Sequence, residues 1–137
     1  MNFYFVDYEN LAENVFELIR NWNRDSSFKT FLVIRENTKH DIDLNKISHI
    51  ELGEIEVIRC KGKKKELVDN ILCSRLGFFI AAHEYNNKDA SFTIISSDNG
   101  FQEVADYWAK FGYDVKFQYI TSEQKKKAKE ALKKMTK

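Results

Sequence analysis

The chain has 137 residues, a length that suits one domain with a single core and is too short for two separate cores. Hydrophobic residues make up 43% of it and aromatic residues 14%, which excludes the composition of a disordered protein. The 22 Lys and Arg nearly balance the 21 Asp and Glu, so the average charge identifies no partner. Their distribution is more informative, because seven lysines and two glutamates between Ser122 and Lys137 form a basic tail behind a mildly acidic body.

The two cysteines, Cys60 and Cys73, show no metal-ligand spacing, and we expect both thiols to be free and packed in or near the core. No segment approaches the roughly 20 apolar residues of a membrane span. The first residues read as a strand and lack the apolar stretch of a signal peptide. We therefore expect a cytoplasmic protein that has no membrane partner.

The first half of the chain alternates strand-like and helical patterns. Residues 2–7 are rich in aromatic and β-branched side chains and predict a central strand that ends at Asp7. Apolar residues then recur at helical spacing from Leu11 to Trp22. A second strand is expected over residues 29–34, a weak short helix over 43–50, and a third strand from residue 55 toward Cys60.

The second half repeats this alternation after a basic loop, the name used here for residues 61–65. A helix is expected over residues 66–85 with Asp69 in its first turn, followed by a strand over 91–95. The next helix is expected to end at Gly112, and a fifth strand covers 113–117. The apolar face of the helix that ends at Gly112 is expected to carry Phe101, Val104, Ala105, Trp108 and Phe111. The alternation predicts right-handed crossovers and a three-layer α/β domain with a mostly parallel sheet, followed by an amphipathic Lys-rich helix.

Three aspartates stand where such a fold places ligands. Asp7 and Asp98 each follow an apolar strand, and the carboxyl ends of neighbouring parallel strands meet at one edge of a sheet. Asp69 lies on the buried face of its helix, at the end nearest the third strand. A charged group in that position needs a partner, because an unpaired buried charge is costly.

Converging carboxylates repel one another unless a cation or protons neutralise them. Mg²⁺ and Mn²⁺ prefer oxygen ligands, and either ion can activate a water and stabilise charge on a phosphodiester. Glu9, Asn10, Ser96 and Ser97 are candidates to support this ion or its waters. An aspartate at a strand end is also a common helix cap or turn residue, so spacing alone leaves both interpretations open.

The segments 5–11, 62–69, 94–101 and 112–115 resemble those of the PIN-like nucleases, including the NYN group. The resemblance covers roughly residues 2–118. It implies a Rossmann-like fold with strand order 3-2-1-4-5, a nuclease domain over residues 1–120, and metal-dependent cleavage of RNA, with 121–137 as a separate Lys-rich helix or tail. Matched position by position, Asp7, Asp69 and Asp98 are the metal-binding and catalytic acids and Asn10 is the amide of the D-x-x-N motif.

Two positions depart from the family pattern. Many members have a further acid two residues beyond the one that matches Asp98, and here that residue is Gly100. Bacterial relatives with an Asp-Lys-Gly-Phe sequence also have glycine there. Glu66 stands where that subgroup has asparagine, and it could supply another carboxylate.

The basic loop is expected at the rim of the acidic site, because it directly precedes the helix that carries Asp69. Its lysines could hold RNA phosphates beside the metal, although a simple solvated loop has the same composition. These lysines are Lys61, Lys63, Lys64 and Lys65. The tail lysines could contact RNA, improve solubility or bind a partner. Arg35, Asn37 and Lys39 could extend the same surface, whereas His40, His49 and His83 lack a ligand spacing.

These observations favour an endoribonuclease that acts on single-stranded or loop RNA with Mg²⁺ or Mn²⁺. The alternative keeps the fold and makes the chain a non-catalytic RNA-binding or protein-interaction module. A homodimer or a protein partner is compatible with either function. A phosphoacceptor receiver domain fits less well, because Arg59 and Cys60 occupy the end of the third strand, where that class needs an acid.

Overall fold

The computed structural model describes residues 2–11, 28–36, 54–85 and 89–135. Most of the helix expected from Leu11 to Trp22 lies outside these residues, as does the short helix expected over 43–50. Asn37, Lys39, His40 and His49 also lie outside them. Within the described part of the chain, no helix is both long and apolar enough to cross a membrane.

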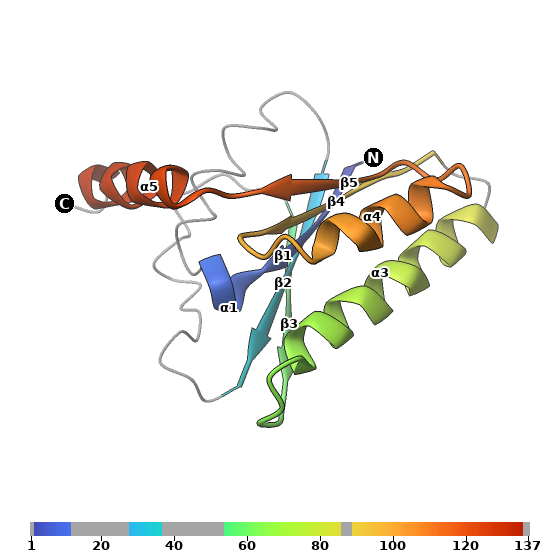
Figure 1. Cartoon of the computed structure of the whole chain (residues 1–137), viewed down its shortest axis with the longest axis horizontal. Coiled ribbons are helices and arrows are strands. Elements are labelled where there is room, and N and C mark those ends of the chain that lie inside the picture. The colour runs from blue at the N-terminus through green and yellow to red at the C-terminus, as the bar shows by residue number, and fades with distance from the viewer. Residues whose placement is uncertain (1, 12–27, 37–53, 86–88, 136–137) are drawn as a thin grey trace.

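Five parallel strands form one sheet in the order β3-β2-β1-β4-β5 (Figure 1), which confirms the expected topology. The strands are β1 (Asn2–Asp7), β2 (Phe28–Arg35), β3 (Glu54–Cys60), β4 (Ser91–Ser96) and β5 (Val115–Tyr119). The helices are α1 (Tyr8–Leu11), α3 (Leu67–Tyr85), α4 (Phe101–Ala109) and α5 (Ser122–Met135). The strand order reverses between β1 and β4, and open α/β sheets bind ligands at such a switch point.

Helices α3 and α4 lie side by side on one face of the sheet. The contact is close, because a Cβ added to Gly77 of α3 would lie 3.4 Å from the Trp108 ring of α4. Helix α4 ends at Ala109, and Phe111 beyond it is 58% exposed, so the expectation that Phe111 continues the apolar face is wrong. The Phe111 ring instead contacts Tyr107 at the surface. Gly112 has a φ of +90°, and this left-handed conformation closes the turn into β5.

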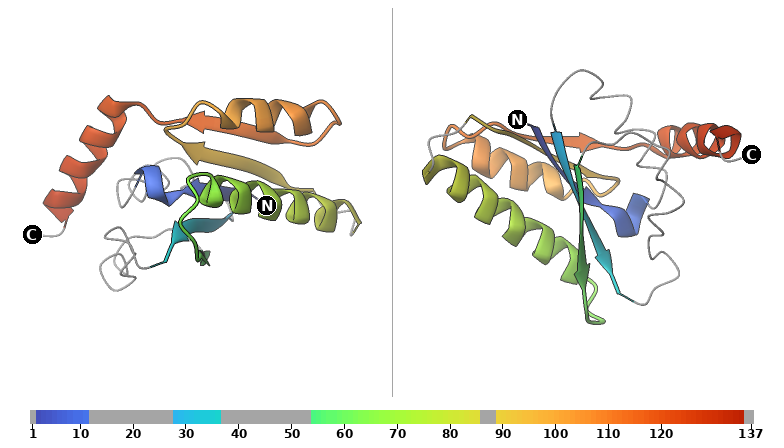
Figure 2. Two further views of the ribbon diagram at one scale, coloured as in Figure 1. Left: turned by 60° about the horizontal axis from the view of Figure 1, so that its bottom comes forward. Right: turned by 180° about the vertical axis from the view of Figure 1, so that it is seen from behind.

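The Lys-rich tail forms the expected helix α5, which extends away from the sheet beyond β5 in both views of Figure 2. Its start is fixed by a reciprocal capping arrangement. The Gln124 N–H donates to Thr121 Oγ1 at 3.1 Å, and the Thr121 N–H donates to Gln124 Oε1 at 2.9 Å. The Ile120 N–H donates to the Ser96 carbonyl at 3.0 Å, so the chain that enters α5 is bound to the end of β4.

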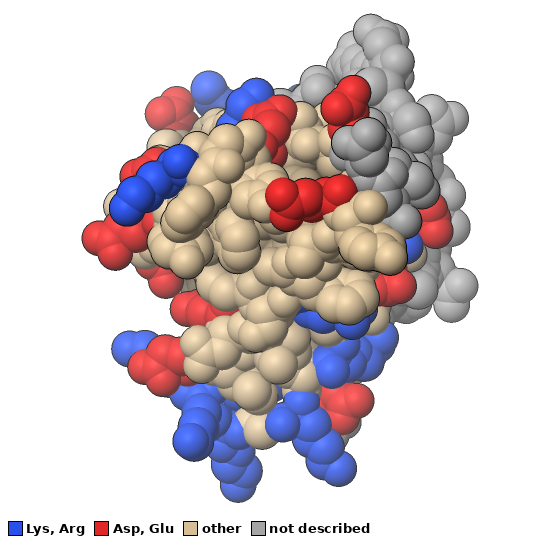
Figure 3. All heavy atoms as spheres, turned by 90° about the vertical axis from the view of Figure 1, so that its right-hand side faces the viewer, with Lys and Arg blue, Asp and Glu red and all other residues tan. Residues whose placement is uncertain are grey.

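The basic loop connects β3 to α3, and all five of its residues are exposed. Figure 3 shows Lys and Arg side chains gathered at the lower end of the molecule, where Figure 1 draws this connection. Gly62 has a φ of +151°, and a Cβ there would lie only 2.9 Å from Leu67 Cδ2. The backbone conformation therefore favours glycine at this position, and any larger residue would also have to displace the end of the Leu67 side chain.

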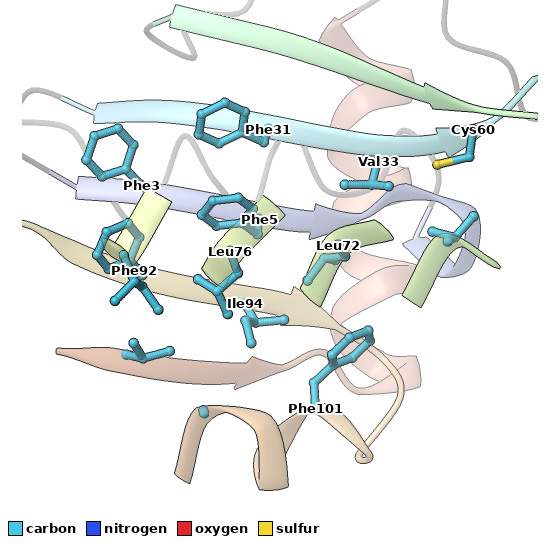
Figure 4. Packing of buried hydrophobic residues seen from close by; sticks show 14 residues of the cluster. Phe3, Phe5, Phe31, Val33, Cys60, Leu72, Leu76, Phe92, Ile94 and Phe101 are labelled. Carbon is cyan, nitrogen blue, oxygen red and sulfur yellow. The ribbon is translucent and has the colours of Figure 1, made fainter. Parts of the chain in front are cut away.

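The core lies between the sheet and helices α3 and α4. Phenylalanines from β1, β2 and β4 face Leu72 and Leu76 of α3 (Figure 4), and both leucines are fully buried. The Phe5 and Phe31 rings stack with centroids 4.8 Å apart. Alternate residues of the central strands, such as Val6, are fully buried as well, as expected for a sheet covered on both faces. This packing anchors the carboxyl ends of β1 and β4, where Asp7 and Asp98 lie.

Candidate functional site

Asp7 is the last residue of β1 and is fully buried. Its Oδ2 accepts hydrogen bonds from Asn10 Nδ2 at 2.5 Å and from Ser96 Oγ at 2.7 Å. Its Oδ1 is also buried and has no hydrogen-bond partner in the described part of the chain. Burial raises the pKa of Asp7, and the two hydrogen bonds offset part of that increase. The structure therefore leaves one buried carboxylate oxygen available for a ligand.

Ser96 joins Asp7 to the segment that carries Asp98. Its hydroxyl donates to Asp7 and accepts the backbone N–H of Asp98 at 2.9 Å. The Asp98 side chain is exposed, and its Oδ1 accepts the Gly100 N–H at 2.9 Å. A Cβ on Gly100 would lie 3.2 Å from that oxygen. Glycine therefore leaves room for the turn that orients Asp98, which gives this departure from the family pattern a local structural reason.

Asp69 lies in the first turn of α3 and is half-buried. Its pKa is raised from 3.8 to about 6, first by burial and then by the negative charges of Asp7, Asp98, Glu9 and Glu66. All three expected aspartates thus lie near enough for their charges to interact. Glu66, the second departure from the family pattern, adds to the negative charge around Asp69.

These side chains surround a pocket of about 550 Å³, called here the acidic pocket. It is lined by Glu9, Asn10, Arg35, Lys63, Lys65, Glu66, Asp69 and Asp98. Asp7 is fully buried near it, within electrostatic range of Asp69. Of the other described residues expected at the site, Ser96, Ser97, Lys61 and Lys64 also lie outside the lining set. Two of the four loop lysines therefore share the pocket with the acids.

Arg35, at the end of β2, lines the acidic pocket and makes three hydrogen bonds within the protein, while its expected contact with RNA stays a prediction. Its Nε donates to Glu9 Oε1 at 2.9 Å, and its Nη1 and Nη2 donate to the carbonyls of Gly62 and Lys64 at 2.6 and 2.8 Å. Glu9, expected to support the metal, lines the pocket and binds this guanidinium. The sequence signal for this arrangement is an arginine at the end of the second strand. That strand pairs with β3, which leads into the basic loop.

The donor groups suit a hard divalent cation, because they are carboxylate oxygens with one buried acceptor unpaired. The repulsion that raises the pKa of Asp69 is the repulsion that a cation would remove. Among the described residues, however, no group of three or more His, Cys, Asp or Glu side chains is already close enough to hold an ion. Cys60 and Cys73 are free thiols, as expected.

A parallel sheet in this order, with acids gathered at its switch point, defines a Rossmann-like α/β domain with a candidate metal site. The chain belongs to the PIN domain family, whose model matches residues 1–118. PIN domains are usually nucleases and generally use divalent metal ions. No curated protein and no solved structure matches the chain. Membership of the NYN group stays a prediction.

Proposed function

We propose that this PIN domain is an endoribonuclease that hydrolyses RNA phosphodiester bonds with Mg²⁺ or Mn²⁺ bound by Asp7, Asp69 and Asp98. The observation that carries the proposal is the environment of Asp69, whose pKa is raised to about 6 by burial and by four neighbouring carboxylates. Clustered acids that disfavour their own charged forms are typical of sites that bind cations or transfer protons. Structural ion pairs, by contrast, would lower the pKa of an acid.

In the proposed reaction, the ion, the polar residues around Asp7 and the two pocket lysines have separate roles. A bound divalent ion would supply an activated water and stabilise negative charge on the phosphate. Asn10 and Ser96 orient Asp7 by donating to its Oδ2, which leaves Oδ1 for the ion. Lys63 and Lys65 line the same pocket and attract the phosphates of the RNA. No covalent bond between the enzyme and RNA is required.

The proposed substrate is a single-stranded or looped RNA. Asp69, Asp98 and the two lysines line one pocket, so cleavage requires a single phosphate to enter between them. A flexible strand can bend to place one phosphate there, whereas a duplex holds its phosphates along a stiff helix. RNA-binding proteins that recognise single-stranded loops and ends likewise depend on the flexibility of unpaired RNA.

The test is cleavage of labelled single-stranded, hairpin and duplex RNAs by the purified chain. We expect cleavage of unpaired RNA with Mn²⁺ or Mg²⁺ and none with EDTA. Asp98→Asn should lower the rate at least about 100-fold and keep the fold, because this side chain is exposed. Asp106→Asn is the matched control, since Asp106 is exposed on α4 and lies outside the lining set of the pocket. A chain that cleaves none of these RNAs with either metal would not be this enzyme.

One observation favours the alternative of a non-catalytic RNA-binding or protein-interaction module. The described residues contain no group of three or more ligand side chains that is already close enough for an ion. Titration with Mn²⁺ separates the two functions. The nuclease should bind Mn²⁺ and lose that binding in Asp69→Asn, whereas the module should bind no Mn²⁺ through its acids. A cytoplasmic location, a homodimer and a protein partner stay predictions.

A further inference from the structure

One arginine connects three segments at the edge of the acidic pocket. Arg35 belongs to β2, Glu9 belongs to α1, and the two carbonyls that accept from Arg35 belong to Gly62 and Lys64 of the basic loop. The guanidinium presents its donors in a rigid plane, so one side chain can satisfy a carboxylate and two carbonyls at once. The Arg35 side chain is 14% exposed, and its bond to Glu9 is partly buried, whereas the two bonds to the loop carbonyls lie at the surface.

The basic loop needs an external support of this kind. It places four lysines within five residues, and all five residues are exposed, so its positive charges repel one another. Its conformation also depends on Gly62, whose φ of +151° disfavours any other residue. The two carbonyls bound by Arg35 flank Lys63, one of the two lysines that line the acidic pocket.

We infer that Arg35 is a positioning residue that fixes the basic loop against α1, so that Lys63 and Lys65 meet the RNA phosphate beside the acids. This inference rests on the proposed function and adds a determinant of RNA binding to it. Arg35 acts through the backbone of the loop, because its Nε, Nη1 and Nη2 each donate to a protein acceptor. Glu9 holds the other side of the guanidinium and thereby links the loop to the helix that follows Asp7.

RNA binding in EDTA provides a test that does not depend on cleavage. Arg35→Gln should weaken the binding of a single-stranded RNA by about tenfold, through loss of ordered lysine–phosphate contacts. Arg35→Lys should restore little, because an ammonium keeps the charge and lacks the planar set of donors. Arg75→Gln is the matched control. Arg75 pairs with Glu56 at 3.0 Å on the side of α3 that packs against β3, outside the lining set of the pocket.

A double-mutant cycle distinguishes positioning from direct contact with RNA. In the parent protein, Lys63→Gln together with Lys65→Gln should weaken RNA binding about tenfold, and in the Arg35→Gln background by less than about threefold. Additive effects of these changes would overturn the inference, because they would assign Arg35 an independent contact with the RNA. Binding that is unchanged in Arg35→Gln would overturn it as well.

The order of the loop can be measured on the protein alone. Arg35→Gln should increase cleavage by a lysine-specific protease within the basic loop by about tenfold, while Arg75→Gln leaves it within twofold. Denaturant unfolding of each variant separates this local effect from a loss of global stability. If the kinetics of RNA cleavage are measurable, Arg35→Gln should raise KM and leave kcat nearly unchanged. Absence of RNA cleavage would refute the nuclease, whereas the protease and binding results would still decide the role of Arg35.

Discussion

Replacement of Asp69 by asparagine should stabilise the folded protein at neutral pH. The pKa of Asp69 is raised from 3.8 to about 6 by burial and by neighbouring acids, so its ionised form destabilises the fold. At about 1.4 kcal/mol per pKa unit, the full difference corresponds to about 3 kcal/mol. Because the side chain is only half-buried, solvent screening reduces the expected gain to about 1 kcal/mol. Asparagine has nearly the same shape and removes the charge.

The gain in stability from Asp69→Asn should depend on pH and appear only where Asp69 is ionised. Below 3.8, Asp69 is protonated in both the folded and the unfolded chain, so the parent and Asp69→Asn should be equally stable. As the pH rises from 3.8 to about 6, the unfolded chain releases its proton first, and the parent becomes less stable than the variant. Above that range the difference should stay constant. Urea unfolding across this pH range, followed by circular dichroism without divalent ions, measures it.

The control for this experiment is Asp106→Asn, an exposed change that should shift the free energy of unfolding by less than about 0.5 kcal/mol at every pH. An Asp69→Asn protein that is less stable than the parent at neutral pH would refute the reasoning. So would a gain of equal size at both ends of the pH range, because the ionisation of Asp69 would then not be its cause. Mn²⁺ should stabilise the parent and leave Asp69→Asn unchanged.

Three further changes test other parts of the account. Ser96→Ala should lower the free energy of unfolding by about 1–3 kcal/mol, because the buried hydroxyl both donates to Asp7 and accepts from the Asp98 N–H. Gly62→Ala should cost about 1–3 kcal/mol and weaken RNA binding, because it adds a contact with Leu67 to a strained backbone. Lys126→Gln combined with Lys129→Gln should lower the salt dependence of RNA binding by up to about 1.4 in log–log slope, if α5 contacts RNA phosphates.

The first two of these changes each have a matched control. Ser74→Ala removes only an exposed bond to the Asn70 carbonyl and should change stability by less than about 0.5 kcal/mol. Gly112→Ala meets backbone strain but no atom within 4 Å, so it should cost less than Gly62→Ala and leave RNA binding unchanged. Equal costs at the two glycines would contradict the proposed contact with Leu67. An unchanged salt slope would assign the α5 lysines to solubility or to a partner.

The topology could be predicted because each strand carries its own signal in the sequence. Aromatic and β-branched runs end at Asp7 and before Asp98, and the paired strands β1 and β4 bring these ends together. The first turn of α3 likewise places Asp69 as expected. The predicted ends of the strands and helices agree less well with the structure. The fifth strand begins at Val115 rather than at Tyr113, because the Val115 N–H donates to the Tyr113 carbonyl at 3.1 Å in a local turn that follows Gly112.

Long-range polar contacts could not be predicted, because they depend on side chains distant in sequence. The bonds of Arg35 span 26 to 29 residues, and the bond between Ser96 and Asp7 spans 89. The sequence pattern identified Asp7 as a site residue but could not indicate that it is fully buried with one oxygen unpaired. It also could not separate Lys63 and Lys65, which line the pocket, from the other loop lysines.

The most direct test of the central claim is a crystal structure of the protein soaked in Mn²⁺, with the ion located by its anomalous scattering. We predict one Mn²⁺ at the acidic pocket, bound by Asp7 Oδ1 together with the carboxylates of Asp69 and Asp98. Asp69→Asn crystals soaked in the same way serve as the control and should lose the ion. An empty pocket in the parent crystals, or an ion bound elsewhere and unaffected by Asp69→Asn, would contradict the account.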